Sequence, residues 1–258
     1  MSCLKQLPGP LYRSFEEHRC LKLIAGLMNF DCDCVIKVAR AAGRSKADLI
    51  DVACDPKLVQ IASRESGGLP VCVSSVEPEL FPAAVAAGAV MVEIGNYDAF
   101  YPQGRIFDAV EVMELARRTR ILLPGITLSV TVPYTLPLDQ QEQLAIDLVV
   151  AGASIIQTEG GTGARPISPG NLGLIEKATP TLAATYSIST ALKAAGIEAP
   201  VLCASGLSPV TIPMAIVAGA SGVGVGSAVS HLENELAMLA MACRLREALS
   251  IVAKHTHV

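Results

Sequence analysis

The sequence predicts a single (β/α)₈ barrel (TIM barrel) of the phosphate-binding type, and three observations support this fold class. Short apolar runs alternate with amphipathic stretches eight times along the chain. A length of 258 residues is usual for one such barrel, and 51% hydrophobic residues are enough for one large core. Near the end of the chain, two neighbouring apolar runs finish in glycine and serine, as strands beside a barrel phosphate site do. We therefore expect one domain over residues 1–258.

The expected strands are continuous apolar runs, because parallel strands in a barrel are covered on both faces. A short helix at Leu11–His18 precedes them and is expected to close the barrel floor. The eight strands are expected at Leu21–Leu27, Asp48–Ala53, Pro70–Val76, Val90–Asn96, Thr127–Pro133, Ser154–Glu159, Val201–Gly206 and Gly222–Val229.

The expected helices lie between these strands. Several begin with proline, as at Pro56, Pro78 and Pro209, and are followed by glycine, the usual end signals of a helix. The helices are expected at Asp33–Ala42, Pro56–Ser66, Pro78–Ala87, Asp108–Thr119, Leu138–Ala151, Ser168–Ala195, Pro209–Ala218 and Leu232–Ala253.

Composition argues against several classes of partner. The net charge is −4 and the lysines and arginines form no block, so a nucleic-acid partner is not expected. No apolar run approaches the roughly 20 residues that span a bilayer, and the first residues lack the apolar stretch of a secretory signal. Eight cysteines are scattered through the expected strands and helices, which favours a reducing compartment and a cytoplasmic protein.

No metal is expected. Cys32 and Cys34 lack the second cysteine pair of a structural zinc site, and Asp33 between them is expected to cap a helix. Free cysteines are commonly buried apolar residues, the expectation for Cys54, Cys72 and Cys203. The four histidines form no catalytic or metal-binding pattern; they are His18, His231, His255 and His257.

The clearest functional signal is an anion site at the ends of the last two strands. Ser205 and Gly206 end strand 7, and Gly224, Gly226 and Ser227 lie on and after strand 8. Glycine allows the backbone to approach an anion, and a following helix N-terminus adds favourable partial charge. These five residues are the expected phosphate-binding residues.

Strand alternation predicts which side chains face the barrel interior. If Gly224 and Gly226 point inward, the polar residues of the other strands do so too, which places one lysine and three carboxylates in one cavity. Burial of such charges is costly unless they pair or change protonation state. The residues expected inside are Lys22, Asp51, Cys72, Ser74, Glu93, Ser129, Thr131, Gln157, Glu159, Cys203 and Ser205.

The four charged residues are the candidate catalytic groups. Lys22 forms either a structural ion pair with Asp51 or Glu159, or an amine of lowered pKa that acts as a base or Schiff-base nucleophile. Glu93 and Glu159 lie near strand ends, where catalytic groups collect, and serve either in acid–base catalysis or in pairing. Asp51 has the same two alternatives and could simply anchor Lys22.

Five other polar residues are candidate substrate contacts. Asn96 begins the loop Asn96–Asp98 after strand 4, and either binds a substrate or caps the next turn; we favour the cap. Arg165 could hold a second anionic group. The candidates are Ser74, Asn96, Thr131, Gln157 and Arg165.

Five runs in this chain resemble the hypothetical chloroplast reading frame twenty-three family of plastid and cyanobacterial proteins. The resemblance implies a phosphate-binding TIM barrel of unknown activity, located in the cytoplasm or, in plastid-bearing relatives, in the stroma. The segment Gly161–Pro166 is not typical of the family. The matching runs are Lys22–Leu27, Asp51–Pro56, Cys72–Pro78, Val92–Asp98 and Ile156–Gly160.

Three functions remain open. The first is an enzyme that acts on a small phosphorylated metabolite by isomerisation, aldol-type cleavage or ring-forming condensation. The second is an FMN-dependent oxidoreductase, because Gly160–Ala164 is similar to a loop of flavin-dependent barrels such as glutamate synthase, although it could equally be a mobile lid. The third is a ligand sensor or scaffold without turnover. The apolar final helix could serve barrel packing or a homo-oligomer contact.

Overall fold

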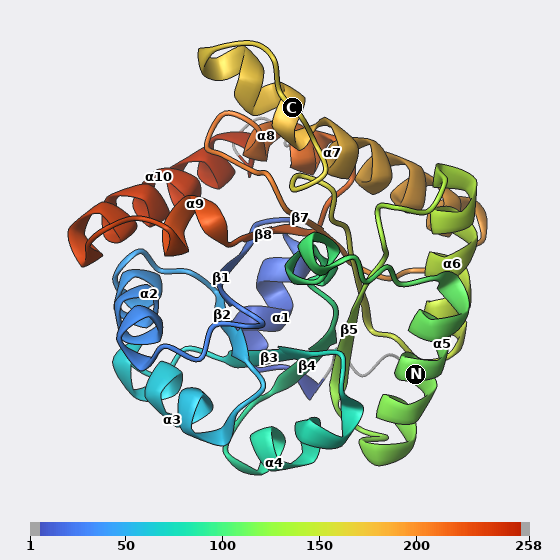
Figure 1. The fold of residues 1–258 in the computed structure, drawn as a ribbon, viewed down its shortest axis with the longest axis horizontal. Helices are drawn as coiled ribbons and strands as arrows, with labels where there is room; N and C mark the ends of the chain where they lie inside the picture. Colours follow the sequence, from blue (N-terminus) through green and yellow to red (C-terminus); the bar gives the residue numbers. More distant parts are fainter. Residues whose placement is uncertain (1–5, 254–258) are drawn as a thin grey trace.

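The computed structural model describes residues 6–253, with side chains to residue 250, and shows a closed barrel of eight parallel strands (Figure 1). Each strand pairs with the next along the chain, and β8 pairs with β1. The TIM-barrel prediction is confirmed. The strands are β1 (Cys20–Gly26), β2 (Leu49–Ala53), β3 (Val71–Ser75), β4 (Met91–Ile94), β5 (Thr127–Thr131), β6 (Ile155–Gln157), β7 (Val201–Ala204) and β8 (Gly222–Val225).

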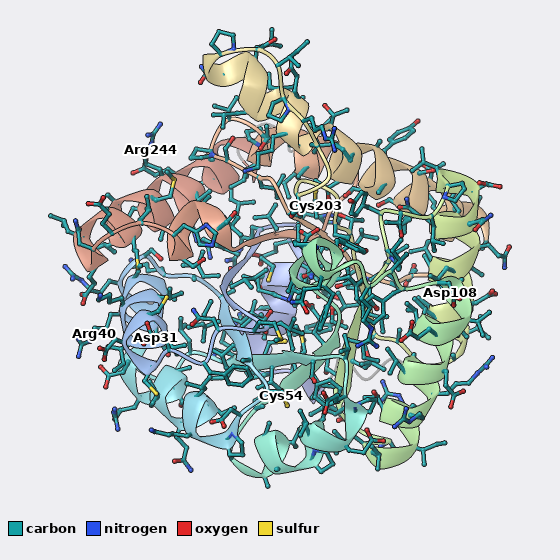
Figure 2. The ribbon with its side chains drawn as sticks, viewed as in Figure 1. Asp31, Arg40, Cys54, Asp108, Cys203 and Arg244 are labelled. Atoms are coloured by element: carbon teal, nitrogen blue, oxygen red, sulfur yellow. The ribbon has the colours of Figure 1, made fainter. Side chains whose placement is uncertain are left out.

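Helices surround the barrel, and side chains fill the space between the two layers (Figures 1 and 2). Among the described residues, three short 3₁₀ helices lie in the connections that follow β3 and β4: η2 (Pro78–Leu80), η3 (Tyr97–Ala99) and η4 (Tyr101–Gln103). The α-helices are α1 (Gly9–Glu16), α2 (Cys32–Arg44), α3 (Pro56–Glu65), α4 (Phe81–Ala86), α5 (Ala109–Leu122), α6 (Leu138–Val150), α7 (Gly170–Ala194), α8 (Ile212–Val217), α9 (Ser227–Ser230) and α10 (Glu235–Ala253).

The barrel has two separate apolar cores. The larger one lies between the strands and the outer helices. The smaller one closes the floor, where Leu11 and Phe15 of α1 pack on the inward residues of the strand beginnings, such as Leu49, Met91 and Leu202. The expected floor helix is thus confirmed, and the polar side chains of the interior lie above an apolar plug.

The end of β8 differs from the sequence-based expectation. The strand stops at Val225 rather than Val229, because Gly226 has φ −106° and ψ −93°, which turns the chain out of the sheet and into the short helix α9. Pro209 begins no helix, since α8 starts only at Ile212. The turn at Gly226 places the start of α9 over the carboxyl ends of the strands.

Two single-residue expectations are wrong. Cys203 points outward, because Leu202 takes the inward position on β7, and the Cys203 thiol lies 3.7 Å from the Thr181 hydroxyl on α7. Asp31, not Asp33, caps α2: its carboxylate accepts the backbone N–H of Asp33 at 2.9 Å (Figure 2 labels Asp31).

Helix α7 is long and extends beyond the barrel at its amino-terminal end (Figure 1). It contains Pro180, whose ring lies against the loop after β6: a Cβ placed on Gly160 would be 2.9 Å from Pro180 Cβ. The loop that crosses this end of the barrel is therefore held by α7. None of the helices within residues 6–253 is long and apolar enough to cross a membrane.

Candidate functional site

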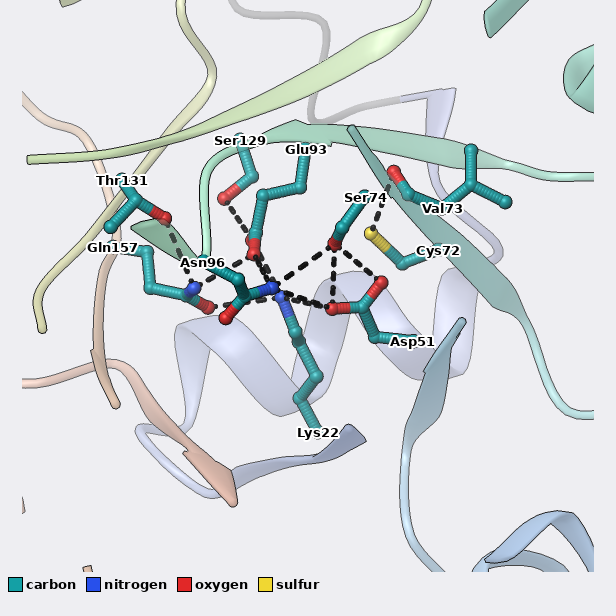
Figure 3. A network of polar contacts seen from close by, with 10 residues as sticks. All are labelled: Lys22, Asp51, Cys72, Val73, Ser74, Glu93, Asn96, Ser129, Thr131 and Gln157. Atoms are coloured by element: carbon teal, nitrogen blue, oxygen red, sulfur yellow. Dashed lines mark hydrogen bonds and ion pairs between the residues drawn. The ribbon is translucent and has the colours of Figure 1, made fainter. Parts of the chain in front are cut away.

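Lys22 lies at the centre of a group of polar side chains inside the barrel (Figure 3). Its Nζ atom is 2.5 Å from Glu93 Oε2 and 3.3 Å from Asp51 Oδ2, and it donates a hydrogen bond to Gln157 Oε1 at 3.0 Å. These contacts join β1, β2, β4 and β6 across the interior. We call the group the buried network; its members are Lys22, Asp51, Ser74, Glu93, Asn96, Ser129, Thr131 and Gln157.

The carboxylates of the buried network are surrounded by hydrogen-bond donors. Asp51 accepts from the Ser74 hydroxyl, which lies 2.7 and 2.8 Å from its two oxygens. Glu93 accepts from Ser129 Oγ at 2.8 Å and from Gln157 Nε2 at 2.7 Å. No buried side-chain nitrogen or oxygen of the network lacks a partner. Complete pairing of this kind is what allows charges to remain in a dry interior.

The electrostatics of the buried network keep Lys22 charged. Burial alone would lower the pKa of Lys22, but Asp51 and Glu93 outweigh burial and hold this pKa above its ordinary value. Burial raises the pKa of Asp51 to about 6, although Lys22 acts in the opposite direction. The alternative of a lysine with lowered pKa, which a base or Schiff-base nucleophile needs, is therefore wrong for this arrangement.

Asn96 separates the buried network from the space above it. Its Nδ2 atom donates to Glu93 Oε1 at 3.1 Å and to the more distant Ser74 Oγ and Asp51 Oδ2 at 3.3 and 3.4 Å. The residue has a left-handed backbone, φ +65°, which turns the chain after β4 so that the side chain reaches down into the barrel. The expected cap is wrong, because the Asn96 side chain makes no capping bond to η3.

A second polar group lies higher, at the carboxyl ends of the strands. The Tyr101 hydroxyl and the Tyr134 backbone N–H, the latter at 3.2 Å, both donate to Glu159 Oε1. The Ser205 hydroxyl donates to Asp98 Oδ2 at 2.7 Å. We call this group the mouth cluster; its members are Asp98, Tyr101, Tyr134, Glu159 and Ser205.

The mouth cluster contains two carboxyl oxygens without partners. Glu159 Oε2 and Asp98 Oδ1 are both buried, and neither has a hydrogen bond to any described residue. Burial, with a smaller contribution from the charge of Asp98, raises the pKa of Glu159 to about 8. Glu159 therefore carries a proton at neutral pH, which is the form that a general acid needs.

The expectation that Glu159 shares one cavity with Lys22 is wrong. Gln157 is the last residue of β6 and occupies the level of Lys22, whereas Glu159 lies two residues further along the chain and reaches Tyr101 and Tyr134 instead. The interior therefore holds one lysine with two carboxylates, and the third carboxyl belongs to a different group above it.

A cavity of about 920 Å³ opens at the carboxyl ends of the strands. It is lined by the loops after β1, β4, β6, β7 and β8, and by Lys177 from α7. Asn96, Asp98 and Glu159 all line it, so the mouth cluster faces this space while Lys22 remains beneath Asn96. This is the barrel end at which enzymes of this fold place their chemistry.

All five expected phosphate-binding residues line the same cavity. Ser205 and Gly206 turn with φ of +73° and +76°, and a Cβ on Gly161 would lie 2.4 Å from Gly206 N, so the loops after β6 and β7 are in contact. The Ser205 hydroxyl accepts from Gly161 N–H at 2.9 Å and donates to Asp98. This hydroxyl is thus engaged within the protein, and an anion would have to rely on other groups.

Other hydrogen-bond donors for an anion come from the turn after β8. Gly226 and Ser227 begin α9, and the first N–H groups of a helix have no partner within it. Lys177 lines the cavity next to Gly206 and forms no ion pair with a described residue. A Cβ on Gly224 would lie 3.0 Å from Ala204 Cβ and 3.2 Å from Ile24 Cδ1, so glycine relieves crowding against the neighbouring strands.

The expected substrate contacts are divided by the structure. Ser74, Thr131 and Gln157 belong to the buried network and do not line the cavity, whereas Asn96 does. Arg165 is exposed and also lies outside the cavity lining.

Three residues of the site, Tyr101, Tyr134 and Lys177, were missed by sequence reasoning, and Asp98 was named only as part of the loop Asn96–Asp98. Tyr101 lies in η4, Tyr134 follows β5 and Lys177 lies on α7. Tyr134 comes just after a strand end, a position that could have marked it as a candidate. No sequence signal indicates that Tyr101 and Lys177 return to the barrel mouth.

The structure gives no separate role to the histidines. His231 is exposed at the cavity rim, and His18 contacts Ala220 O at 2.9 Å near the floor. His255 and His257 lie outside the described residues. Within residues 6–253, no group of three or more metal-ligating side chains is found.

Comparison with known proteins agrees with the fold and with the sequence resemblance. The model of the family described as "Protein of unknown function (DUF561)" matches residues 7–256. The uncharacterized protein ycf23 of Cyanophora paradoxa is 43% identical over 224 residues, 87% of this chain and 90% of that protein.

Two solved structures illustrate the fold likeness. Thiamine phosphate pyrophosphorylase from Pyrococcus furiosus aligns with a TM-score of 0.58 at 15% identity, covering 92% of this chain and 98% of that chain. A 3-hexulose-6-phosphate synthase aligns with a TM-score of 0.61 at 16% identity, covering 89% and 99%. At these identities the likeness establishes the barrel fold alone.

Proposed function

The chain belongs to the DUF561 family, and we propose that it is an enzyme that transforms a small phosphorylated metabolite by proton transfer, with Glu159 as the proton donor. One observation carries the proposal. Glu159 is 3% exposed, is protonated at neutral pH and has one oxygen without a partner, and it lines the cavity at the catalytic end of the barrel. A carboxyl kept neutral in this way is suited to give its proton to a substrate oxygen.

The phosphate of the metabolite is proposed to bind near Gly206, Gly226 and Ser227, with Lys177 supplying positive charge. Backbone N–H groups at the start of α9 and an unpaired ammonium group complement a phosphate dianion. The titles of two structural neighbours, a thiamine phosphate pyrophosphorylase and a 3-hexulose-6-phosphate synthase, name phosphate compounds and are compatible with this choice.

Isomerisation, aldol-type cleavage and ring-forming condensation all remain within the proposal, because each needs proton transfer beside a carbonyl or hydroxyl group. Schiff-base chemistry on Lys22 is not part of it, since this ammonium group is paired with Asp51 and Glu93 below Asn96. The buried network supports the site by holding Asn96 at the cavity floor.

The first experiment identifies a ligand and then tests Glu159. Mass spectrometry of small molecules released from the native protein, together with thermal shifts measured with phosphorylated metabolites, should identify a compound that stabilises the fold. A ligand at a concentration of about 100 times its Kd raises the free energy of unfolding by about 2.7 kcal/mol. With that compound, Glu159→Gln should leave Kd within a few-fold and lower kcat by about 10² or more.

The matched control is Glu77→Gln, which makes the same change after β3, at the same end of the barrel, on an exposed side chain outside the cavity lining. It should leave kcat unchanged. A wild-type protein that binds the compound but never consumes it would favour the sensor alternative, and a yellow protein with flavin absorbance would favour the FMN-dependent oxidoreductase. Wild-type turnover by Glu159→Gln would remove Glu159 from the proposal.

A further inference from the structure

Two carboxyl oxygens of the mouth cluster have no recorded partner, and both belong to residues that line the cavity. Glu159 Oε2 and Asp98 Oδ1 are buried without a hydrogen-bond partner, and both residues line the cavity. A buried carboxyl oxygen without a partner costs about 1 to 3 kcal/mol. Tyr97, Gln141 and Arg246 also carry a buried polar atom without a recorded partner, but these residues lie outside the cavity lining. Asp98 and Glu159 are therefore the groups that a ligand in the cavity is placed to complete.

The two carboxyl groups differ in how they are held. Glu159 is almost fully buried and uses its other oxygen to accept from Tyr101 and from the Tyr134 N–H. Asp98 is less deeply buried, and its other oxygen accepts from the Ser205 hydroxyl. Burial disfavours the ionised form of a carboxyl group, so the more buried Glu159 is the better proton donor of the two, and Asp98, which lies nearer to solvent, is the candidate proton acceptor.

We propose that Asp98 is the catalytic base and Glu159 the catalytic acid of one pair, and that their substrate class is a phosphorylated α-hydroxy aldehyde or ketone. The inference deepens the proposed function and rests on it. An acid and a base side by side are what enolisation next to a carbonyl requires, because proton removal from carbon and proton delivery to oxygen must occur together.

The Asp98 carboxylate takes the proton from the carbon that bears the hydroxyl group, and the electrons of this C–H bond form a carbon–carbon double bond. The π electrons of the carbonyl take the proton of Glu159, which gives an enediol, a protonated Asp98 and an ionised Glu159. In the second half, the other enediol hydroxyl returns a proton to Glu159 and Asp98 protonates the other carbon. The carbonyl has then moved by one carbon, and both side chains have regained their starting forms.

The geometry also accounts for the two ends of such a substrate. In the proposed complex the carbonyl and hydroxyl oxygens of the substrate are the partners of Glu159 and Asp98, while the phosphate lies toward Lys177, which lines the same cavity. A cavity of about 920 Å³ is large enough for a small sugar phosphate.

Solvent exchange tests the proposal without knowledge of the natural substrate. Dihydroxyacetone phosphate, ribose 5-phosphate and fructose 6-phosphate are each incubated with the protein in D₂O, and loss of the C–H signal next to the carbonyl is followed by NMR against a protein-free blank. At least one probe should stabilise the protein thermally and exchange. Asp98→Asn and Glu159→Gln should each slow exchange about 100-fold or more while Kd for that probe stays within a few-fold.

The matched control is Asp139→Asn, because Asp139 is exposed in the first turn of α6 and lies outside the cavity lining. It should exchange at the wild-type rate. Should Asp98→Asn melt below the assay temperature, Asp98→Ser replaces it with the same expectation.

The outcomes separate the two proposals. Stabilisation of wild type by a probe without any exchange overturns the acid–base pair and leaves phosphate binding intact. Stabilisation by inorganic phosphate but by none of the three probes overturns the substrate class. Exchange at the wild-type rate by Asp98→Asn overturns the role of Asp98. Binding of neither inorganic phosphate nor any probe overturns the proposed function itself.

Discussion

The buried network and the mouth cluster each contain an aspartate, a glutamate and at least one serine but are built in opposite ways. Around Lys22, every buried polar atom has a partner and the lysine balances its two carboxylates. Around Glu159 no basic side chain is present among its recorded partners, and two carboxyl oxygens are left without any partner. Glu159 is nearly as deeply buried as the carboxylates of the network, so burial of the carboxyl group alone does not distinguish the two sites.

The difference indicates which group supports the fold and which is set up for chemistry. A satisfied ion pair has no free capacity for a substrate and is expensive to disturb. An unsatisfied carboxyl is unfavourable in the folded protein and is retained where binding or catalysis requires it. Asn96 connects the buried network to the cavity, because its side chain donates a hydrogen bond to Glu93 and the residue also lines the cavity.

The strongest test of this comparison is Lys22→Met, which should destabilise the protein by about 3 to 5 kcal/mol, the usual cost of breaking a buried ion pair. The change leaves Asp51 and Glu93 without their cation in a site that excludes water. Urea unfolding measures the loss. The control is Lys57→Met, on the exposed face of α3, which should change stability by less than about 0.5 kcal/mol. Equal stability of the two variants would mean that Lys22 does not hold the interior together.

The second test uses the pH dependence of stability. The pKa of Glu159 is about 8 in the folded protein and 4.5 in its ordinary environment, so the folded state keeps a proton that the unfolded state loses between these values. Stability should therefore fall as pH rises from about 4.5 to about 8 and then level off. Glu159→Gln removes this pH dependence and should be more stable than wild type by several kcal/mol at high pH, with little difference at low pH.

Melting curves of wild type, Glu159→Gln and the exposed control Glu77→Gln at several pH values decide this test. Asp51 also has a raised pKa, but it titrates in all three proteins, so its contribution cancels in the comparison. A constant difference between wild type and Glu159→Gln across the whole range would show that Glu159 is not a buried acid.

Sequence reasoning was sufficient for the barrel because its signals are local and repeated. Apolar runs, helix end signals and alternation place Lys22, Asp51 and Glu93 inside the barrel correctly. Alternation is less secure at strand ends. It failed at Cys203, where Leu202 is the inward residue, and beyond Val225, where Gly226 leaves the sheet.

The composition of each polar group could not be predicted in the same way. Which carboxyl pairs with Lys22 depends on the height of each residue in the barrel, and this height follows from strand stagger rather than from spacing in the chain. Tyr101 reaches Glu159 from a 3₁₀ turn, and Lys177 reaches Gly206 from the middle of a long helix. Both contacts join segments that are far apart in the sequence, and no sequence pattern predicts them.

The smallest expected effect concerns the two cations considered for anion binding, Lys177 and Arg165. Lys177 lines the cavity beside Gly206 without an ion pair to a described residue, whereas Arg165 is exposed and lies outside the lining. Lys177→Ala should weaken binding of a phosphorylated ligand about tenfold, or about 1.4 kcal/mol, because one partly solvated charge is lost. Arg165→Ala should change Kd less than about twofold, as expected for a surface charge.

Titration calorimetry at two salt concentrations measures Kd for both variants. The loss of affinity caused by Lys177→Ala should be smaller at the higher salt concentration, because salt screens a partly exposed charge. A larger effect of Arg165→Ala than of Lys177→Ala would mean that the loop after β6 closes over the bound ligand and brings Arg165 to the phosphate. The cavity mouth would then change shape on binding, while the buried network below it would not.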